Sequence, residues 1–469
     1  MLTKWLRKIL PGKPEAAATH SHKQVLPQNE HGITPDGISY AAEKVVSRLQ
    51  QAGFEAYVVG GAVRDLLLGV EPKDFDVATN ARPEEVRKVF RRSRIIGRRF
   101  QIVHVMVGPE TIEVTTFRGG SRPARQNEHG RIMQDNAYGT VEQDAQRRDF
   151  TCNALYYNPA RGEITDFHHG VADIRAKRLV MIGDARARYQ EDPVRMLRAA
   201  RLSGKLGFQV APETLRLMAD MVQSGEADAL VAERVWQEFA RGLMEARPVC
   251  MIEVLRQCGA LAVLLPEVEA LFGVPQRADY HPEIDCGLHT LMVLQRAADM
   301  NLGLPARYAA LLHDLGKALT PPDLLPKHHG HDLAGIAPVQ TVNRRWRVPK
   351  QCAELAELVC RWHIVLHNVF TLKTSTALNV LQKTDAFRRP ERFRTALDVC
   401  QADIQGRLGR ENAPYPQRAH WLALLEAAAQ TDTAAIAAAC EHPAHIPEAI
   451  RRARLEAIRP LHKARTQTD

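Results

Sequence analysis

Two kinds of hydrophobic pattern divide this chain of 469 residues. Up to about residue 175, short apolar runs of strand length alternate with segments whose apolar residues recur at helical spacing. The expected strands are "EAYVVGG", "KDFDVAT", "RIIGRRFQIVHVMVG" and "TIEVTTFRGG", and the expected helices are "GISYAAEKVVSRLQQAG", "AVRDLLLG" and "RPEEVRKVFRR". Farther along the chain, spacing of the i, i+3, i+4 type dominates. The pattern therefore predicts an α/β portion followed by an almost wholly helical remainder.

Breaks in this pattern suggest a division into five segments. They are a disordered basic arm at 1–35, an α/β head at 36–175, a helical neck at 176–275, a second helical block at 276–410 and a helical tail at 411–469. The arm is expected to be disordered because it is rich in polar residues and proline and has no periodicity. The tail follows the Pro-containing break "NAPYPQ".

Composition and charge narrow the class of protein. No apolar run is long enough to cross a membrane, and the basic start of the chain lacks the apolar core of a signal peptide. The 8 cysteines are dispersed without CxxC spacing, which favours free thiols in a reducing compartment. The net charge of +9 favours a polyanionic partner, nucleic acid first. We therefore expect a cytoplasmic protein that binds nucleic acid and no membrane.

One basic run stands out within the head. It contains Arg87, Lys88, Arg91, Arg92, Arg94, Arg98 and Arg99. Such a run can follow the phosphates of an RNA backbone. The alternative is a solvated helix face and turn with no ligand.

The stretch "KDFDVAT" carries two carboxylates around one aromatic residue. In a strand, residues i and i+2 point the same way, so Asp74 and Asp76 would share a face while Phe75 points into the core. A divalent cation relieves the repulsion between such carboxylates, and Mg²⁺ with bound phosphates is the usual occupant. Two such ions can clamp the attacking and leaving oxygens of a phosphoryl transfer. Glu113, on a neighbouring expected strand, is the best candidate for a third carboxylate.

A glycine pair precedes the carboxylates. Gly60 and Gly61 would let backbone N–H groups approach a triphosphate, and Arg64 would add a charge-assisted contact. The alternative is a plain strand-to-helix turn followed by solvated aspartates. The combined spacing of the glycines, Arg64 and the aspartates favours the phosphate site.

A later helix contains the stretch "EDPVR". Asp192 and Arg195 are three residues apart and would lie on one helix face. Asp accepts hydrogen bonds and Arg only donates them, which matches the edges of adenine and cytosine and leaves unpaired groups against guanine and uracil. The alternative is an ordinary ion pair on a helix surface.

Three motifs in this order resemble one known superfamily. "GGAVRDLLLG…KDFDVAT", "RRDFTCNAL" (147–155) and "EDPVRMLRAARL" (191–202) are similar to class II nucleotidyltransferases, which include CCA-adding enzymes and bacterial poly(A) polymerases. The resemblance implies a polymerase-β-like α/β head with a mixed sheet, followed by an all-α neck, body and tail. It also implies Mg²⁺ at the head and ATP as a substrate. By the same resemblance, the nucleotide's ribose and phosphates would be held by Arg147, Arg148, Asp149 and Asn153.

A second candidate site lies in the helical block. The adjacent pair His313-Asp314 can give an imidazole and a carboxylate to one metal ion. With His289 and Asp403 it forms an H…HD…D set that resembles the HD phosphohydrolases, which implies a divalent metal and hydrolysis of 2′,3′-cyclic or monoester phosphates. The further candidate ligands are His328, His329, His331 and His363. The alternative is a His-Asp pair with only a structural role.

The motifs disagree about the nucleotide that is added. The stretch around "GRRF" and His104 resembles bacterial poly(A) polymerases, whereas the chain beyond about residue 205 resembles CCA-adding enzymes with an HD domain. Because nucleotide choice resides in the head and neck, the sequence favours adding AMP from ATP to RNA 3′ ends, whether of mRNA, small RNA or tRNA. The alternative is CCA addition to tRNA from CTP and ATP, with phosphohydrolase activity at the HD site. Two other readings are an HD hydrolase with a relic head and a non-enzymatic RNA-binding protein.

Overall fold

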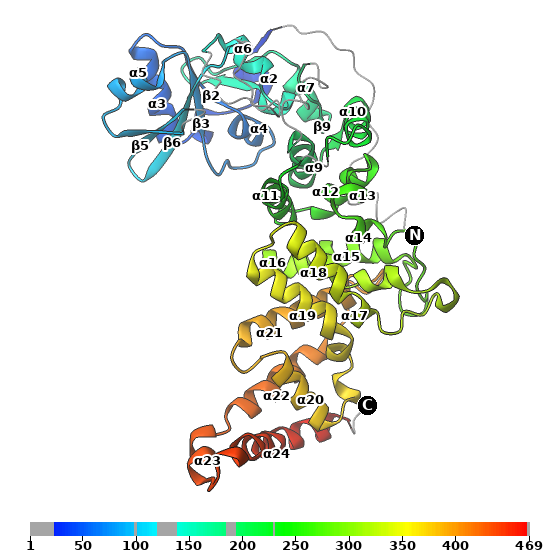
Figure 1. Cartoon of the computed structure of the whole chain (residues 1–469). Coiled ribbons are helices and arrows are strands. Elements are labelled where there is room, and N and C mark those ends of the chain that lie inside the picture. Colours follow the sequence, from blue (N-terminus) through cyan, green and yellow to red (C-terminus); the bar gives the residue numbers. More distant parts are fainter. Residues whose placement is uncertain (1–22, 98–100, 120–137, 184–193, 228–229, 467–469) are drawn as a thin grey trace. The chain divides into compact units, whose positions relative to one another are not determined.

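The computed structural model describes residues 23–97, 101–119, 138–183, 194–227 and 230–466. The chain divides after Ala227 into two compact units, each of which is described by itself (Figure 1).

The first unit is built on an eight-stranded mixed sheet, with strand order β1-β8-β7-β2-β3-β6-β5-β4. The strands are β1 (Gln24–Leu26), β2 (Ala56–Val59), β3 (Asp76–Thr79), β4 (Ser93–Ile96), β5 (Ile102–Val107), β6 (Glu110–Thr116), β7 (Leu155–Asn158) and β8 (Glu163–Asp166). β3 and β6 are parallel, and the other pairs are antiparallel. The mixed sheet expected for the head is confirmed.

Helices cover this sheet. They are α2 (Gln28–His31), α3 (Tyr40–Gln51), α4 (Gly61–Leu67), α5 (Pro83–Val89), α6 (Val141–Gln146) and α7 (Gly170–Arg175). α3 packs on β2, β3 and β6, as Figure 1 shows. Ser39 caps α3 by accepting a hydrogen bond from the backbone N–H of Ala42, and the face that meets the sheet is apolar. The aromatic side chains of Phe117, Tyr156 and Phe167 pack in one buried cluster beside β2 and β3.

The strand expected at "KDFDVAT" is shorter than predicted. It begins at Asp76 rather than Lys73, and Phe75 is only half-buried. Val77, Ala78 and Thr79 are all buried because β3 lies in the middle of the sheet, with neighbours on both edges. The chemistry of this strand is therefore concentrated at its exposed first residue.

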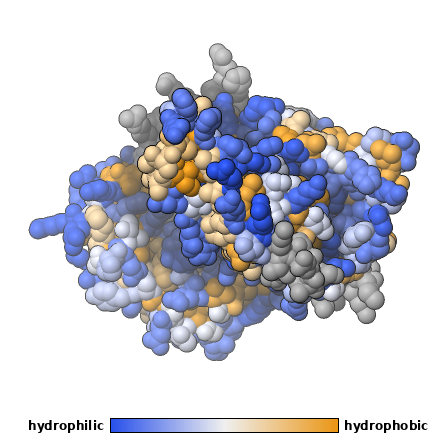
Figure 2. Space-filling view, turned by 90° about the horizontal axis from the view of Figure 1, so that it is seen from below, coloured by the Kyte–Doolittle hydropathy of each residue, from blue (hydrophilic) through white to orange (hydrophobic). Residues whose placement is uncertain are grey.

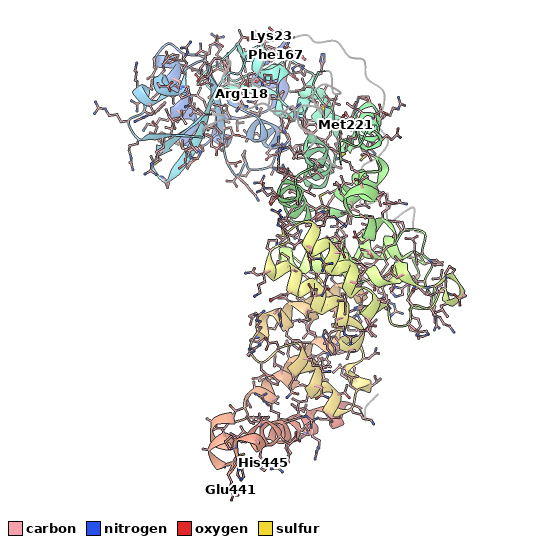
Figure 3. The ribbon with its side chains drawn as sticks, viewed as in Figure 1. Lys23, Arg118, Phe167, Met221, Glu441 and His445 are labelled. Carbon is pink, nitrogen blue, oxygen red and sulfur yellow. The ribbon has the colours of Figure 1, made fainter. Side chains whose placement is uncertain are left out.

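The prediction of a disordered segment up to residue 35 is wrong for residues 23–35. β1 pairs antiparallel with β8, in the register Gln24 to Asp166, and covers an edge of the sheet. Lys23 and Phe167, which flank this pair, lie together in Figure 3. His31 is buried, and its Nε2 lies 3.0 Å from the carbonyl oxygen of Gly162. Composition alone missed these tertiary contacts; residues 1–22 lie outside the described part.

The first unit ends with a short segment that was expected to be wholly helical. α9 (Val194–Leu206) and α10 (Pro212–Gln223) match that expectation. β9 (Arg178–Leu179), which precedes α9, and β10 (Gln209–Val210), which lies between α9 and α10, also form a two-residue parallel ladder. Met221, labelled in Figure 3, is buried near the end of α10.

The second unit consists of helices. They are α11 (Ala232–Leu243), α12 (Pro248–Gln257), α13 (Ala260–Leu264), α14 (Pro266–Glu269), α15 (Cys286–Asp299), α16 (Leu304–Leu312), α17 (His331–Ala334), α18 (Ile336–Arg345), α19 (Lys350–His367), α20 (Thr374–Lys383), α21 (Pro390–Gln405), α22 (Pro416–Ala429), α23 (Thr433–Ala439) and α24 (Ile446–Thr466). α15, α16, α19 and α21 form one packed group, in which His289 lies on α15, the pair His313-Asp314 directly follows α16, and Asp403 lies on α21. Glu441 and His445 mark the turn between α23 and α24 (Figure 3).

Among the described residues, none of the helices has the length and hydropathy needed to cross a bilayer. Figure 2 shows mainly hydrophilic residues on one face of the molecule, with smaller hydrophobic patches between them.

Candidate active sites

The three predicted carboxylates of the head come together at the start of β3, beside the middle of β6. Asp76 opens β3, and Glu113 is its register partner on the parallel strand β6. Asp74 lies in the loop just before β3, so strand alternation does not hold it in place as predicted. All three side chains are exposed. Parallel pairing, rather than the i, i+2 pattern alone, is what brings a third carboxylate beside Asp76.

The charges of this cluster are unfavourable without a cation. Partial desolvation of the Asp76 carboxyl, followed by repulsion from Glu113 and Asp74, raises its pKa to about 6, and Arg148 opposes the shift. A divalent cation would reverse this repulsion, so the donor set fits Mg²⁺.

Glu113 has a further neighbour. His104 on β5 is its register partner on the other side, and His104 Nε2 lies 3.3 Å from Glu113 Oε1. The imidazole can therefore donate a hydrogen bond to the carboxylate and limit its rotation. His104 belongs to the stretch around "GRRF", whose Arg98 and Arg99 lie outside the described residues.

The predicted glycine pair forms the turn from β2 into α4. Gly60 has φ 74° and ψ −130°, a region that only glycine occupies readily. A Cβ at Gly60 would lie 3.2 Å from Nη1 of Arg148. At Gly61 it would lie 3.4 Å from Nη2 of Arg64. The turn thus brings bare backbone close to two guanidinium groups, as a site for phosphates requires.

Arg64 is buried inside the head rather than exposed beside the glycines. Its Nη1 donates to Asn153 Oδ1 at 2.5 Å, and its Nε and Nη2 donate to Asp65 Oδ1 at 2.8 and 2.6 Å. Asp65 also pairs with Lys205 of α9 at 3.3 Å. Two residues predicted to bind the nucleotide, Arg64 and Asn153, therefore contact each other. Their role toward phosphate stays a prediction.

The "RRD" and "EDPVR" motifs also meet. Asp149 accepts from Arg195 Nε at 2.9 Å and from Arg198 Nη1 at 2.8 Å, so it joins the head to helix α9. Arg195, predicted to read the base, is thus held by a carboxylate from the other motif. Its predicted partner Asp192 lies outside the described residues.

Arg148 is the centre of a buried network that the sequence did not reveal. Its Nε donates to the Tyr156 hydroxyl at 2.9 Å and its Nη1 to the carbonyl oxygen of Asn153 at 3.1 Å. Tyr156 in turn donates to Asp144 Oδ2 at 2.7 Å, and Asp144 also pairs with Arg148 at 3.3 Å. Arg147 donates instead to the carbonyl oxygen of Gly119 at 2.7 Å. Only the spacing of Asp144 and Arg148, four residues apart, could have indicated this pair.

The basic run of the head is partly described. Five of its residues are exposed on α5, in the segment that follows it and on β4: Arg87, Lys88, Arg91, Arg92 and Arg94. This exposure suits either an RNA backbone or a solvated face, so the choice stays open.

In the second unit, the four residues of the HD set converge from separate helices. His289 lies on α15, His313 follows α16, and Asp403 lies on α21. His289 Nε2 is 3.0 Å from Asp403 Oδ1 and 3.8 Å from Asp314 Oδ2, and His313 Nε2 is 3.2 Å from Asp314 Oδ2. All four residues are buried.

The chemistry of this set fits a divalent metal. Both carboxylate oxygens of Asp314 and Nε2 of His313 are buried without a well-directed hydrogen bond to any described residue. Burial opposes ionisation, but His313 and Lys317 hold the pKa of Asp314 well below its usual range. Buried anionic oxygens facing imidazole nitrogens are the donors that divalent transition metals select.

Neighbouring groups orient the histidines. His313 Nδ1 lies 2.8 Å from the Ala310 carbonyl oxygen, and His289 Nδ1 lies 2.9 Å from Glu283 Oε1. Such contacts fix the tautomer and leave Nε2 toward a metal. Glu283, which also contacts His281 at 3.0 Å, was missed because it lies outside the HD motif, in the loop before α15.

Three further residues border this site. Lys317 Nζ is 2.6 Å from Asp314 Oδ2, His367 Nε2 is 2.7 Å from Asp403 Oδ2, and Arg407 Nη2 is 3.7 Å from Asp403 Oδ1. The spacing of four residues between His363 and His367 on α19 was the available signal. A pocket of about 300 Å³ opens beside the site, and its lining includes Lys317 and Arg407.

The additional histidines differ in their fit. His331 Nε2 and His363 Nε2 lie 3.2 and 3.5 Å from Asp314 Oδ1. Both nitrogens of His328 have other contacts, with Thr320 at 2.7 Å and the Pro275 carbonyl oxygen at 3.0 Å. His329 is exposed at the pocket. His331 and His363 therefore remain as candidate ligands.

Comparison with known proteins identifies the family. Residues 56–180 match the "Poly A polymerase head domain", residues 207–272 the "Probable RNA and SrmB- binding site of polymerase A", and residues 287–403 the "HD domain". A multifunctional CCA protein of Neisseria gonorrhoeae is 58% identical over 87% of this chain and 99% of its own length. The chain belongs to the family of multifunctional CCA proteins. It is therefore an enzyme, and the resemblance to class II nucleotidyltransferases is confirmed.

Solved structures share the fold. A Bacillus stearothermophilus CCA-adding enzyme, solved in complex with CTP, superposes with a TM-score of 0.63 over 89% of this chain and 91% of its own, at 23% identity. A Thermotoga maritima CCA-adding enzyme in complex with tRNA gives a TM-score of 0.60 over 94% of this chain and 99% of its own, at 16% identity. These likenesses confirm the fold class, an α/β head followed by helices.

The family favours one of the two activities that the sequence left open. The main prediction, AMP addition of the poly(A) polymerase type, is supported less well than its alternative, CCA addition. The head motifs did not discriminate between the two activities, because the same head domain type occurs in both. This chain matches the poly(A) polymerase head domain and is also 58% identical to a multifunctional CCA protein.

Proposed function

We propose that this protein adds the CCA sequence to tRNA 3′ ends, using CTP and ATP with Mg²⁺. The observation that carries the proposal is the carboxylate cluster of Asp74, Asp76 and Glu113 at the start of β3, in a chain of the multifunctional CCA family. Enzymes with close structural likeness have been solved with CTP and with tRNA, which supports the same substrates here.

In this proposal, the carboxylates hold Mg²⁺, which supplies positive charge at the RNA 3′-hydroxyl and the α-phosphate when bound. The Gly60–Gly61 turn admits the triphosphate, and Arg148 lies beside that turn. The Asp149 pairs with Arg195 and Arg198 position α9, where the base would be read. The 3′-hydroxyl oxygen bonds to the α-phosphorus as the bond to pyrophosphate breaks, so the balance of the step requires only proton loss from the hydroxyl.

The test uses a tRNA that ends before CCA and an unstructured RNA, each with ATP alone, CTP alone or both. We expect three-nucleotide addition on the tRNA that requires CTP and ATP together. Long A tails made from ATP alone on either RNA would contradict this proposal and restore the poly(A) reading. Asp76→Asn should abolish transfer. Glu71→Gln, which removes an exposed carboxylate before the same loop, serves as the matched control.

We infer a second activity for the HD site, hydrolysis of 2′,3′-cyclic or monoester phosphates at RNA ends or on nucleotides. The supporting observation is the convergence of buried imidazole Nε2 atoms on Asp314 and Asp403 next to a pocket that Lys317 and Arg407 line. These cations suit a phosphate substrate. Asp314→Asn and chelation should each abolish phosphate release, whereas Asp76→Asn should leave it intact. Equal hydrolysis by Asp314→Asn would refute this assignment.

The division into a head, a neck (176–275), an HD block (276–410) and a tail (411–469), with residues 23–35 added to the head, and a cytoplasmic location complete the proposal. The cytoplasm is where newly made tRNA, CTP and ATP are all present in a bacterium, and the family relatives are bacterial.

A further inference from the structure

The pocket beside the HD set has room for more than a phosphate group. Its volume of about 300 Å³ is within the range of about 300–1,000 Å³ that is typical of small-molecule sites. Two of its cations lie against the aspartates of the HD set: Lys317 Nζ is 2.6 Å from Asp314 Oδ2, and Arg407 Nη2 is 3.7 Å from Asp403 Oδ1. These cations hold positive charge for a phosphate at the HD set and leave the remainder of the pocket for another part of the substrate.

The remainder of the pocket lining includes exposed apolar side chains. Tyr280 is 53% exposed and Ile364 is 37% exposed, and both line the pocket together with Pro326. Small-molecule sites combine apolar and aromatic walls with a few polar groups that orient the ligand. The lining therefore suits a substrate that joins an anionic group to a flat apolar one.

The loop that carries Tyr280 is anchored on both sides of that residue. The guanidinium of Arg277 lies 4.8 Å from the centre of the Tyr280 ring, and Arg277 Nε donates to Asp279 Oδ1 at 3.0 Å. On the other side, the ring of His281 packs against that of His289, with centroids 4.5 Å apart. Because His289 belongs to the HD set, the loop holds the exposed Tyr280 ring at a fixed place beside that set.

Arg407 connects the charged and the aromatic parts of the pocket. Its Nη2 is 3.7 Å from Asp403 Oδ1, and its Nη1 is 3.5 Å from the carbonyl oxygen of Tyr280. One guanidinium thus reaches both the HD set and the aromatic loop. A phosphate that Arg407 contacts is next to the loop that carries Tyr280, as the phosphate of a nucleotide is next to its base across one ribose.

We propose that Tyr280 stacks on the nucleobase of the substrate and makes the HD site select nucleotides and RNA ends over phosphoesters that lack a base. This inference rests on the phosphohydrolase proposed above, and it names a residue that determines the specificity of that site. Stacking on an aromatic side chain tolerates any base, because every base has a π-face. The phosphate is bound by Lys317 and Arg407, and the base by Tyr280.

The test compares two substrates with the same reacting group. They are adenosine 2′,3′-cyclic phosphate and methyl β-D-ribofuranoside 2′,3′-cyclic phosphate, which lacks the base. The full chain carries Asp76→Asn, so that transfer at the head does not compete. Mg²⁺, Mn²⁺, Co²⁺ and Ni²⁺ are supplied in turn, and the ring-opened monoester is measured by ion-exchange chromatography. The measured quantity is the ratio of kcat/KM for the nucleotide to kcat/KM for the base-free ester.

We expect this ratio to favour the nucleotide by about 5–100-fold, the range that one stacked base supplies. Tyr280→Ala should bring the ratio close to one by raising the KM for the nucleotide, because stacking far from the reacting bond contributes to binding rather than to the chemical step. Tyr280→Phe keeps the ring and should keep the ratio. Ile284→Ala is the matched control, because Ile284 is an exposed apolar residue of the same loop outside the described lining of the pocket.

The outcomes separate this inference from the hydrolase on which it rests. Equal efficiency on the two substrates in the parent would overturn base stacking and leave the hydrolase standing. A ratio that Tyr280→Ala leaves unchanged, or that Tyr280→Phe lowers as much as Tyr280→Ala does, would also overturn it. Hydrolysis of neither substrate with any of the four metal ions would overturn both this inference and the proposed hydrolase.

Discussion

Replacing Asp76 in the carboxylate cluster of the head should lower the activity of the protein and raise the stability of its metal-free form. In the folded, metal-free chain the pKa of Asp76 is raised from 3.8 to about 6, so the folded state holds its proton more tightly than the unfolded state does. The sign follows from linkage: stability falls as the pH rises through the interval from 3.8 to about 6, and the full cost remains at neutral pH. Asp76→Asn should therefore stabilise the metal-free protein above this interval.

The size of the effect can be bounded. A shift of about two pKa units corresponds to about 3 kcal/mol at about 1.4 kcal/mol per unit. Because the Asp76 side chain is exposed, solvent screening reduces the expected gain to about 1 kcal/mol. For a unit of this size, that gain raises the melting temperature by about 2–4 °C.

The assay is thermal unfolding in chelator at pH 7.5 and pH 4, followed by the same scan with Mg²⁺. Asp76→Asn should melt higher than the parent at pH 7.5 and equally at pH 4, where the parent carboxyl is protonated. Mg²⁺ should stabilise the parent and not the variant, since only an intact site gains binding energy. Glu71→Gln should resemble the parent throughout. A variant that melts lower than the parent at pH 7.5, or that gains as much from Mg²⁺, would refute the carboxylate-cluster argument.

Three other changes test the surrounding structure. Gly60→Ala should cost about 1–3 kcal/mol in urea unfolding, because alanine is strained at φ 74° and ψ −130°. Gly69→Ala, where a Cβ meets open space, should cost less, and an equal cost at both positions would contradict this reasoning. Asp149→Asn should cost about 1–3 kcal/mol, because it weakens two charge-assisted contacts to α9, and an unchanged urea midpoint would argue against that bracing role. Glu283→Gln should weaken metal binding at the HD site about 10–100-fold by titration calorimetry, because Glu283 orients His289. Asp279→Asn, at an exposed position in the same loop, is its control, and equal affinities in the two variants would remove Glu283 from the site.

The hydrophobic periodicity of this chain predicted the type of its helices and strands well, but it did not predict their tertiary contacts. The helix at α3 and the strands at β2 and β6 were predictable because their apolar positions follow one period. β1 was not, because a run of three residues, Gln24 to Leu26, is too short to signal a strand. Its stability comes from pairing with β8, which is far away in the sequence. Sheet order is likewise set by long-range pairing, so the parallel contact of β3 with β6 had no local signal.

The sites show the same limit in terms of side chains. Motif spacing located Asp74, Asp76, His313 and Asp314, because each motif places two reactive groups within a few residues. Residues that orient these groups were missed. Glu283 and His367 approach the HD site from a loop and from the end of α19, where only the folded backbone makes them neighbours. For Arg64 the motif located the residue but not its partners. The motif predicted a phosphate contact, whereas in the fold Arg64 donates hydrogen bonds to Asp65 and Asn153.

The choice between adenylate and CCA addition could not be read from the base-recognition motif for a chemical reason. Adenine and cytosine present the same order of donor and acceptor to an Asp/Arg pair, so such a pair excludes guanine and uracil but accepts both correct bases. If the predicted Asp192/Arg195 pair reads the base, discrimination between the two would depend on size, since adenine is a purine and cytosine a pyrimidine. The space beside Arg195 is set by the position of α9. Asp149 of the head pairs with Arg195 and Arg198 of α9, and Lys205 of α9 pairs with Asp65 of the head. It follows that the order of addition should be sensitive to the contacts that position α9, even though these residues make no hydrogen bond that distinguishes one base from the other.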